Sequence, residues 1–568
     1  MNRNRPNGWG RDESMPGKRG ACSRSFFGAG RERGAFSCIR SRAFSCAGLL
    51  GAIAVGLAGS PALGDNAAGG ATGAGAPATP PAAPPVSSTT GGTEPGVAAD
   101  ANSPSERFKR GMAAARKEDW KTAETELEAV VAATPKDARA QAWLGYSYLQ
   151  EGQPQEAIKY LTQATVLLPS MVDAHNNLGN AYLQTGDTDK AIVQYQAAVN
   201  LKPDSFQALY NLGNAYARTD RWSDAIAQYV RALALDKKSA AAHNNLGVAY
   251  THVKNTEKAI VEYAAAVDLA PKEPVYVANL GLALKDAHRD TDALAKLQQA
   301  VALGADSDEV HEALGDVYAR AGDYKHSISE YQIVAQHDPK NGAVFHALAS
   351  VYVREGDIPT AIIAANKAVE LDPGSVSSWL DLGWMYENVF AKSNKKDDAD
   401  SAIRALTQAV TLDPQSTVGL SNLAIAYWKA DKHEQAADTW KKLLHVNPND
   451  LDARQSLAKF YVDRMEFDEA ARQFRLALHT QPQSADLHNG LGIVLEEDND
   501  FDGALQEFKK ATTLNSKLAE AFNNMGVVYE KKGMIDEAKA NYRKALLIDP
   551  HLADAKENLD RFEAGNPH

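Results

Sequence analysis

The chain is poor in cysteine. Its three cysteines, Cys22, Cys38 and Cys46, all precede residue 64, so the remaining sequence contains none. This longer part therefore has no disulfide, no thiol nucleophile and no thiolate ligand for a metal. We expect no cofactor and no bound metal.

A catalytic residue set is also missing from the sequence. His311 and His433 are each followed by Glu, as in a zinc-protease motif, but Gly315 and Ala437 stand where the second histidine would be. No glycine-rich loop that could cradle a phosphate is present. We therefore expect a protein that is not an enzyme.

Positive charge is scarce outside the N-terminus. Residues 1–64 contain ten Lys and Arg against three Asp and Glu, which leaves 50 cations and 69 acids in residues 65–568, a net charge of -19. Such an acidic body is a poor partner for nucleic acid or for an anionic membrane surface. We expect no nucleic acid among its partners.

The first 64 residues resemble a targeting segment. A basic leader precedes the apolar stretch 43–59, and small residues follow at Ala62 and Gly64. This order is typical of a secretory signal peptide, which predicts an exported, periplasmic or envelope-associated protein. An uncleaved anchor and a cytoplasmic protein with a misassigned start, for which Met15 is one candidate, remain open.

Large apolar side chains are almost absent from residues 65–103, which are mostly Ala, Gly, Pro, Thr and Ser. A segment of this composition cannot bury enough surface to offset the entropy lost on ordering. We interpret it as a disordered linker.

From residue 104 to residue 552 the sequence repeats with a period of about 34 residues. We number each repeat so that a small residue is position 8. These residues are Gly111, Gly145, Gly179, Gly213, Gly247, Gly281, Gly315, Ala349, Gly383, Ala424, Ala458, Gly492 and Gly526. Position 11 is usually Tyr, position 20 is Ala except at Ser327, position 15 is often Gly, and position 32 is mostly Pro.

The spacing of these positions predicts two helices in every repeat. Positions 4, 7, 8 and 11 lie on one face of a first helix, and positions 20, 24 and 27 on one face of a second. Small residues at positions 8 and 20 let the two helices approach closely. Gly at position 15 suits the turn between them, and Pro at position 32 ends the second helix.

In its spacing and in these residues the sequence resembles the tetratricopeptide repeat family. The resemblance covers residues 104–552, and within the family the repeats are most similar to those of O-GlcNAc transferases, without a catalytic domain. It implies an all-α, right-handed TPR superhelix of thirteen helix-turn-helix repeats, with the first helices lining the concave face. Residues 553–568 are expected to form a polar capping helix and tail.

One repeat contains seven extra residues, at about 390–396 (FAKSNKK). The sequence allows two interpretations, a tolerated loop insertion or a basic finger that contacts a partner through Lys392, Lys395 and Lys396.

Asparagines recur on the predicted concave face. Position 6 holds Asn177, Asn211, Asn245 and Asn279 in successive repeats, and Asn180 and Asn214 lie nearby. Because an amide both donates and accepts hydrogen bonds, a row of amides can bracket a peptide backbone. O-GlcNAc transferases look similar here, and the resemblance implies binding of extended polypeptides. The alternative is that these asparagines only cap helices or face solvent.

Two tryptophans suggest a second binding patch. Trp384 occupies position 9 and Trp428 position 12 of the next repeat, so both are expected in the groove, where aromatic side chains anchor partners well. A purely structural role is equally open.

Together these features predict a non-catalytic scaffold that binds extended segments of other proteins in its concave groove, in the bacterial cell envelope. A scaffold for exopolysaccharide synthesis or export is the first alternative, since amides and tryptophans also suit sugars. A cytosolic regulator is the second. The sequence does not indicate an oligomeric state.

Overall fold

The computed structural model describes residues 102–563, and these residues form helices and turns without a strand. The predicted signal segment (1–64) and nearly all of the predicted linker (65–101) lie outside the described residues. The helices are α3 Pro104–Ala115, α4 Trp120–Ala133, α5 Ala138–Gln150, α6 Pro154–Leu167, α7 Val172–Gln184, α8 Thr188–Leu201, α9 Phe206–Ala217, α10 Trp222–Leu235, α11 Ala240–His252, α12 Thr256–Leu269, α13 Pro274–Asp286, α14 Asp290–Ala302, α15 Asp308–Ala321, α16 Tyr324–His337, α17 Gly342–Glu355, α18 Ile358–Leu371, α19 Val376–Ser393, α20 Lys396–Leu412, α21 Thr417–Lys429, α22 His433–Val446, α23 Leu451–Asp463, α24 Phe467–Thr480, α25 Ala485–Glu497, α26 Phe501–Leu514, α27 Ala519–Lys531, α28 Ile535–Ile548 and α29 Ala553–Glu563.

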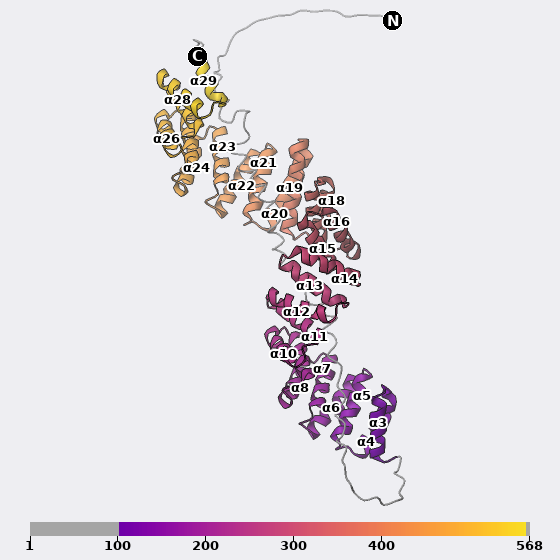
Figure 1. The fold of residues 1–568 in the computed structure, drawn as a ribbon. Helices are drawn as coiled ribbons and strands as arrows, with labels where there is room; N and C mark the ends of the chain where they lie inside the picture. Colours follow the sequence, from indigo (N-terminus) through magenta and orange to yellow (C-terminus); the bar gives the residue numbers. More distant parts are fainter. Residues whose placement is uncertain (1–101, 564–568) are drawn as a thin grey trace, which may run out of the picture. The chain divides into compact units, whose positions relative to one another are not determined.

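These helices form an all-α solenoid. Nearly every first helix packs against the second helix that follows it, and the second helix then packs against the first helix of the next repeat (Figure 1). Helices α3–α16 and α19–α28 form the expected pairs, and α29 packs on α28 as the additional C-terminal helix. The helical fold predicted from the period is confirmed.

The chain divides into two compact units after Asp357. We describe the unit containing α3–α17 and the unit containing α18–α29 separately. The former is called the N-terminal unit and the latter the C-terminal unit.

The small residue at position 8 leaves room for the side chain at position 24. A Cβ added to Gly213 would lie 2.6 Å from Cε1 of Tyr229, and one added to Gly145 would lie 2.6 Å from Cγ of Leu161. Both partner side chains are fully buried. Glycine therefore lets the second helix press a large side chain directly against the backbone of the first.

Position 15 imposes a left-handed backbone on the turn between the helices of a pair. Glycines occupy it with φ of +81° at Gly152 and +83° at Gly186, as expected from the sequence. Other repeats place larger residues there in the same conformation, with φ of 57° at Lys254 and 62° at Met465. An L side chain is disfavoured in this conformation, so packing of the pair holds these turns in place.

Hydrogen bonds also join neighbouring repeats. The hydroxyl of Tyr318 at position 11 accepts a bond from Gln298 at position 25 of the preceding repeat (2.7 Å), and Tyr352 accepts one from Gln332 in the same way (3.2 Å). A second bond of this kind starts at position 4, where His488 contacts the carbonyl oxygen of Pro482 (3.1 Å). Tyr at position 11 therefore does more than fill space.

The seven inserted residues form neither a loop nor an extended finger. Helix α19 has 18 residues and α20 has 17, whereas most helices here have 12 to 14. Residues 390–393 continue α19, and Lys396 already begins α20. Because one helical turn takes 3.6 residues, seven residues add about one turn to each helix. The loop interpretation is therefore wrong.

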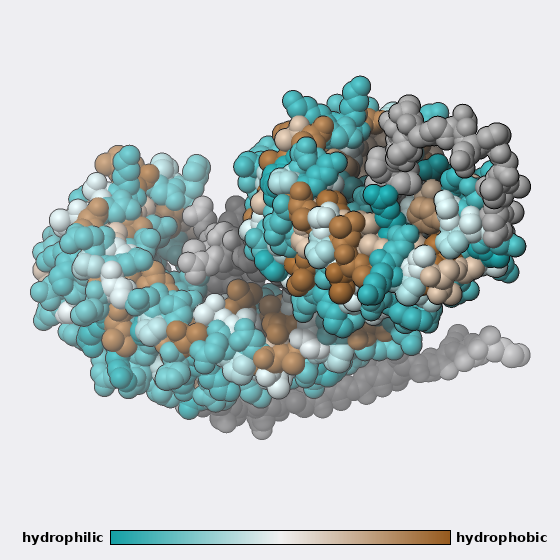
Figure 2. Space-filling model, turned by 90° about the horizontal axis from the view of Figure 1, so that it is seen from below, coloured by the Kyte–Doolittle hydropathy of each residue, from teal (hydrophilic) through white to brown (hydrophobic). Residues whose placement is uncertain are grey.

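The surface is largely hydrophilic, and hydrophobic residues form small separate patches on the face in Figure 2. None of the helices within residues 102–563 combines the length and the apolar character that a membrane span requires.

Candidate binding groove

The first helices form the inner wall of the N-terminal unit. Successive first helices contact one another from α3 through α15, and no comparable contact joins successive second helices between α4 and α16. The first helices are therefore the closer-spaced layer, and the side chains at positions 5, 6, 9 and 12 lie on the side away from the second helices. This surface is where the sequence predicts the groove.

Asparagine side chains tie these helices together along the inner wall. Nδ2 of Asn211 on α9 donates to Oδ1 of Asn176 on α7 (2.9 Å) and to Oδ1 of Asn180 (3.2 Å). One repeat later, Nδ2 of Asn245 donates to Oδ1 of Asn214 (2.9 Å). An amide at position 6 thus bonds back to position 5 or 9 of the preceding repeat.

The row continues to α13 in the same manner. Nδ2 of Asn279 donates to Oδ1 of Asn244 (2.8 Å), and Asn245 also donates to the hydroxyl of Tyr210 (3.1 Å). Asn177, at the start of the row, is fully buried. These asparagines therefore neither cap helices nor face solvent.

Tyrosines of the second helices fix the amides at position 9. The hydroxyl of Tyr195 donates to Oδ1 of Asn180 (2.6 Å), and that of Tyr229 donates to Oδ1 of Asn214 (2.7 Å). Each ring passes the glycine at position 8, and its hydroxyl meets the inner wall beyond it. Burial raises the pKa of the Tyr229 hydroxyl well above its usual range, so this group remains a donor.

Once these bonds are made, the fully buried groups without a partner on the inner wall are all donors. They are Nδ2 of Asn176, Nδ2 of Asn214 and Nε1 of Trp143. All three residues are at most 2% exposed. Trp143 occupies position 6 of its repeat, where later repeats have asparagine. The wall therefore offers N–H groups to a ligand that supplies oxygen acceptors.

Sequence reasoning identified the asparagine row but missed Trp143. The signal was available, because Trp143 stands at position 6 immediately before Asn177 in the series. The ring of Trp143 meets Tyr146 edge-on (5.8 Å), and the guanidinium of Arg116 lies 6.0 Å from the Trp143 ring. The row of donors therefore starts one repeat earlier than the sequence indicated.

Carboxyl groups dominate the inner wall at α15. Glu309, Glu312 and Asp316 occupy positions 2, 5 and 9 of this helix. Burial is the main cause that raises the pKa of both Glu309 and Glu312, and the Asn341 amide, which donates to Glu312 (3.2 Å), opposes the rise at Glu312. Asp316 accepts a bond from the hydroxyl of Tyr331 (2.5 Å).

In the C-terminal unit the predicted tryptophans have different surroundings. Trp428 is half-buried against Trp440 (ring centroids 5.4 Å apart) and His433 (4.2 Å), and the Lys459 ammonium lies 5.4 Å from its ring. Trp384 is also half-buried. Among the described residues no ring contact joins Trp384 to Trp428, so the structure does not bring them into one aromatic pair.

A packing change interrupts the asparagine row in this unit. In the repeat that begins with α23, position 8 is Ala458 and position 24 is Phe474. The ring of Phe474 lies against Gly490, which occupies position 6 of the next repeat. A Cβ added to Gly490 would lie 2.4 Å from Cε1 of Phe474. The row resumes where Asn524 donates to Asn489 (3.2 Å) and Asn558 to Asn523 (3.1 Å). Helix α29 therefore joins α27 through the same bond as an internal repeat.

Comparison with known families decides the identity. Models of the tetratricopeptide repeat match residues 108–171, 179–220, 210–274 and 519–552, and a model of the C-terminal domain of cilia and flagella-associated protein 70 matches residues 301–517. The chain is a tetratricopeptide repeat protein. Proteins of this fold generally act as non-catalytic scaffolds that bind other proteins.

Solved structures of other tetratricopeptide proteins are similar to this one. MamA is 24% identical over 30% of this chain and 92% of its own (TM-score 0.28). YrrB, described as having an unusual peptide-binding site, is 22% identical over 32% and 95% (TM-score 0.31). A chain of the APC/C hetero-tetramer Cut9–Hcn1 is 16% identical over 81% and 96% (TM-score 0.30). No curated protein matches the chain.

Proposed function

We propose that this tetratricopeptide repeat protein is a non-catalytic scaffold that holds an extended polypeptide segment in the groove of its N-terminal unit. The single observation that carries the proposal is the set of buried donors without partners on the inner wall, Nε1 of Trp143 and Nδ2 of Asn176 and Asn214. A buried donor without a partner costs about 1–3 kcal/mol, which a ligand acceptor would relieve.

An extended peptide fits these donors because its backbone presents carbonyl oxygens at regular intervals whatever its sequence. A polysaccharide fits less well. Each sugar hydroxyl also carries a donor that needs an acceptor, whereas Oδ1 of Asn180 and of Asn214 already accept two bonds each. We therefore favour polypeptide over the exopolysaccharide alternative.

The basic and apolar pattern of residues 1–64 supports action in the cell envelope. Fractionation followed by N-terminal sequencing tests this part. We expect an envelope-associated protein that lacks the leader, and a cytosolic protein with an intact leader would exclude export.

Peptide binding is tested by removing the unpartnered donor of Asn214 and keeping the oxygen through which the same side chain accepts its hydrogen bonds. Asn214→Asp keeps the oxygen that accepts from Tyr229 and Asn245 and replaces the NH₂ group with an acceptor. We expect binding to an array of unstructured peptides to fall at least about tenfold, since one donor bond of about 1.4 kcal/mol is lost. The same change at Asn422, a half-buried position-6 asparagine of the C-terminal unit, is the matched control.

Circular dichroism and thermal denaturation establish that both variants remain folded. Equal peptide binding by wild type and the Asn214→Asp variant would remove the donor row from the proposed function.

A further inference from the structure

The charges on the inner wall of the N-terminal unit are separated along the groove. On α5 and on α3 with its C-cap residue, the charged residues at the wall positions and at the flanking positions 2 and 13 are Lys109, Arg116 and Arg139. All three are cations, and we call them the cationic end. On α15 the corresponding residues include Glu309, Glu312 and Asp316, which we call the acidic end.

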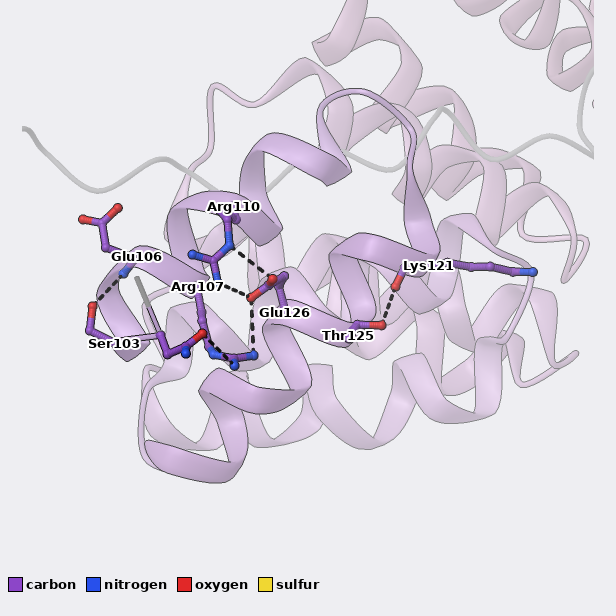
Figure 3. Close-up of polar contacts among 8 residues, drawn as sticks. Ser103, Glu106, Arg107, Arg110, Lys121, Thr125 and Glu126 are labelled. Carbon is purple, nitrogen blue, oxygen red and sulfur yellow. Dashed lines mark hydrogen bonds and ion pairs between the residues drawn. The ribbon is translucent and has the colours of Figure 1, made fainter. Parts of the chain in front are cut away.

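Two of the three cations at the cationic end, Arg116 and Arg139, make no ion pair within residues 102–563. Two other arginines of α3 are paired, as Figure 3 shows. Arg107 and Arg110 both contact Glu126 on α4, with Nη2 of Arg110 2.9 Å from Oε2 of Glu126. Arg116 and Arg139 are exposed, and no carboxylate within residues 102–563 pairs with either of them. Glu106 pairs with Lys109 at an exposed site.

The acidic end is only partly compensated. Nζ of Lys285 lies 3.8 Å from Asp316 and 3.6 Å from Asp286, and Arg320 is engaged by Asp290 on α14 (2.8 Å). Within the part of the chain that the structure describes, no ion pair joins a cation to Glu309 or Glu312. Burial raises the pKa of both groups, as expected for carboxylates that lack a cationic partner.

Between the two ends the wall is nearly neutral. Helices α7, α9 and α11 contribute mainly asparagines, with one Asp173 and one Arg218 at the outer wall positions. Charge is therefore concentrated at the two ends of the wall, and the amide row lies between them.

We infer that the groove selects an extended polypeptide with carboxylates at one end and basic side chains at the other, with the carboxylates against α3 and α5 and the basic side chains against α15. This inference deepens the proposed function and depends on it. Helices pack about 8–10 Å apart and an extended chain advances about 3.3 Å per residue. The two charged groups of the ligand should therefore be separated by about 12–15 residues.

Fluorescence anisotropy with the full chain tests the inference. The probe is a synthetic peptide with an aspartate run and a lysine run separated by an uncharged linker of about 12 residues. Peptides with a neutral sequence, with aspartate at both ends and with lysine at both ends are the comparisons. We expect the mixed-charge peptide to bind at least about tenfold tighter than the others at low salt, and the preference to weaken as salt is added.

A charge-reversal variant provides the second arm. In Arg116→Glu/Arg139→Glu both ends of the groove are acidic, so the preference should move to the peptide with lysine at both ends. Both substitutions are at exposed positions, so we expect the fold to persist.

Photocrosslinking identifies the site. A photoreactive group placed beside the aspartate run should attach to residues of α3 or α5. A second peptide carries a C-terminal carboxylate in place of the aspartates. Comparing the two peptides shows whether the site binds side-chain carboxylates or a terminal carboxylate. Attachment of the aspartate end to α15 would overturn the inference. If the neutral peptide binds as tightly as the mixed-charge one, this inference fails and groove binding stands. If no peptide binds, the proposed function fails as well.

Discussion

The inner walls of the two units differ in the residue at position 8 and in the position-24 side chain that packs against it. In the N-terminal unit, Tyr195 and Tyr229 pass a glycine at position 8 and hold amides in the groove. In the C-terminal unit, Ala424 and Ala458 occupy position 8, and the rings behind them, Trp440 and Phe474, lie against Trp428 and Gly490 instead. The side chain at position 24 therefore has different neighbours on the inner wall in these repeats: an amide in the N-terminal unit, and an aromatic ring or a glycine in the C-terminal unit.

This difference shows that core and groove are not independent in a tetratricopeptide repeat. An amide at position 9 occurs where a tyrosine stands at position 24, as in Asn180 with Tyr195. Where position 9 is apolar, the tyrosine hydroxyl turns elsewhere, as Tyr542 does to Glu530 (2.8 Å). A change in the core is therefore expected to alter the ligand-binding face.

The largest loss of stability is expected from filling the space that Gly213 leaves for the Tyr229 ring in the N-terminal unit. In Gly213→Ala the new methyl would overlap the buried Tyr229 ring, and overpacking of this kind costs about 1–3 kcal/mol. Urea denaturation, with hydrogen exchange in α9 and α10, should report a loss near the upper end of that range.

Gly186→Ala is the matched control for this change. It adds the same methyl at a turn with open space and φ of +83°, so the loss should reflect backbone strain alone. A Gly213→Ala protein that is no less stable than this control would contradict the packing argument.

The second prediction concerns the displaced ring of the C-terminal unit. Gly490→Ala alone should lower stability by about 1–3 kcal/mol, because the methyl would meet Phe474. Adding Ala458→Gly lets the ring return to position 8, so the double variant should recover about 1 kcal/mol of the loss. A double-mutant cycle by urea denaturation measures the coupling, and additive losses would show that the two sites do not share the ring.

A smaller effect is expected from removing one hydroxyl. Tyr229→Phe leaves the core packing intact but deprives Oδ1 of Asn214 of its short bond, which should cost about 1 kcal/mol and weaken peptide binding. Tyr427→Phe is the control, since the hydroxyl of this half-buried tyrosine makes no hydrogen bond to another described residue. Equal thermal midpoints for the two variants would argue against a tethering role for Tyr229.

The most specific effect depends on pH. Burial and the neighbouring Glu151 raise the pKa of Glu124 from 4.5 to about 7. Because the folded state holds this proton more tightly than the unfolded state, the N-terminal unit should lose stability as the pH rises from 4.5 to about 7. Glu124→Gln should therefore be more stable than wild type above pH 7 and similar near pH 4. Parallel pH profiles for the two proteins would exclude this.

The sequence predicted most of the fold and only part of the site. The period, the small residues and the left-handed turn at Gly152 sufficed for the helix pairs, since each is a local signal. The direction of each amide could not be predicted, because it depends on Tyr195 and Tyr229 from another helix. The ring of Phe474 lies against Gly490 of the next repeat. This displacement could not be predicted either, because it depends on residues of two repeats together.

The seven residues inserted between α19 and α20 have a consequence for how such a chain can change in length. Because they add about one whole turn to each helix, every side chain beyond them keeps its original orientation. An insertion of about half a turn in one helix would instead rotate the buried stripe toward water. Natural variation in helix length within a stacked repeat should therefore proceed in whole turns, and a paired lengthening would extend the edge of the solenoid while leaving its stacking untouched.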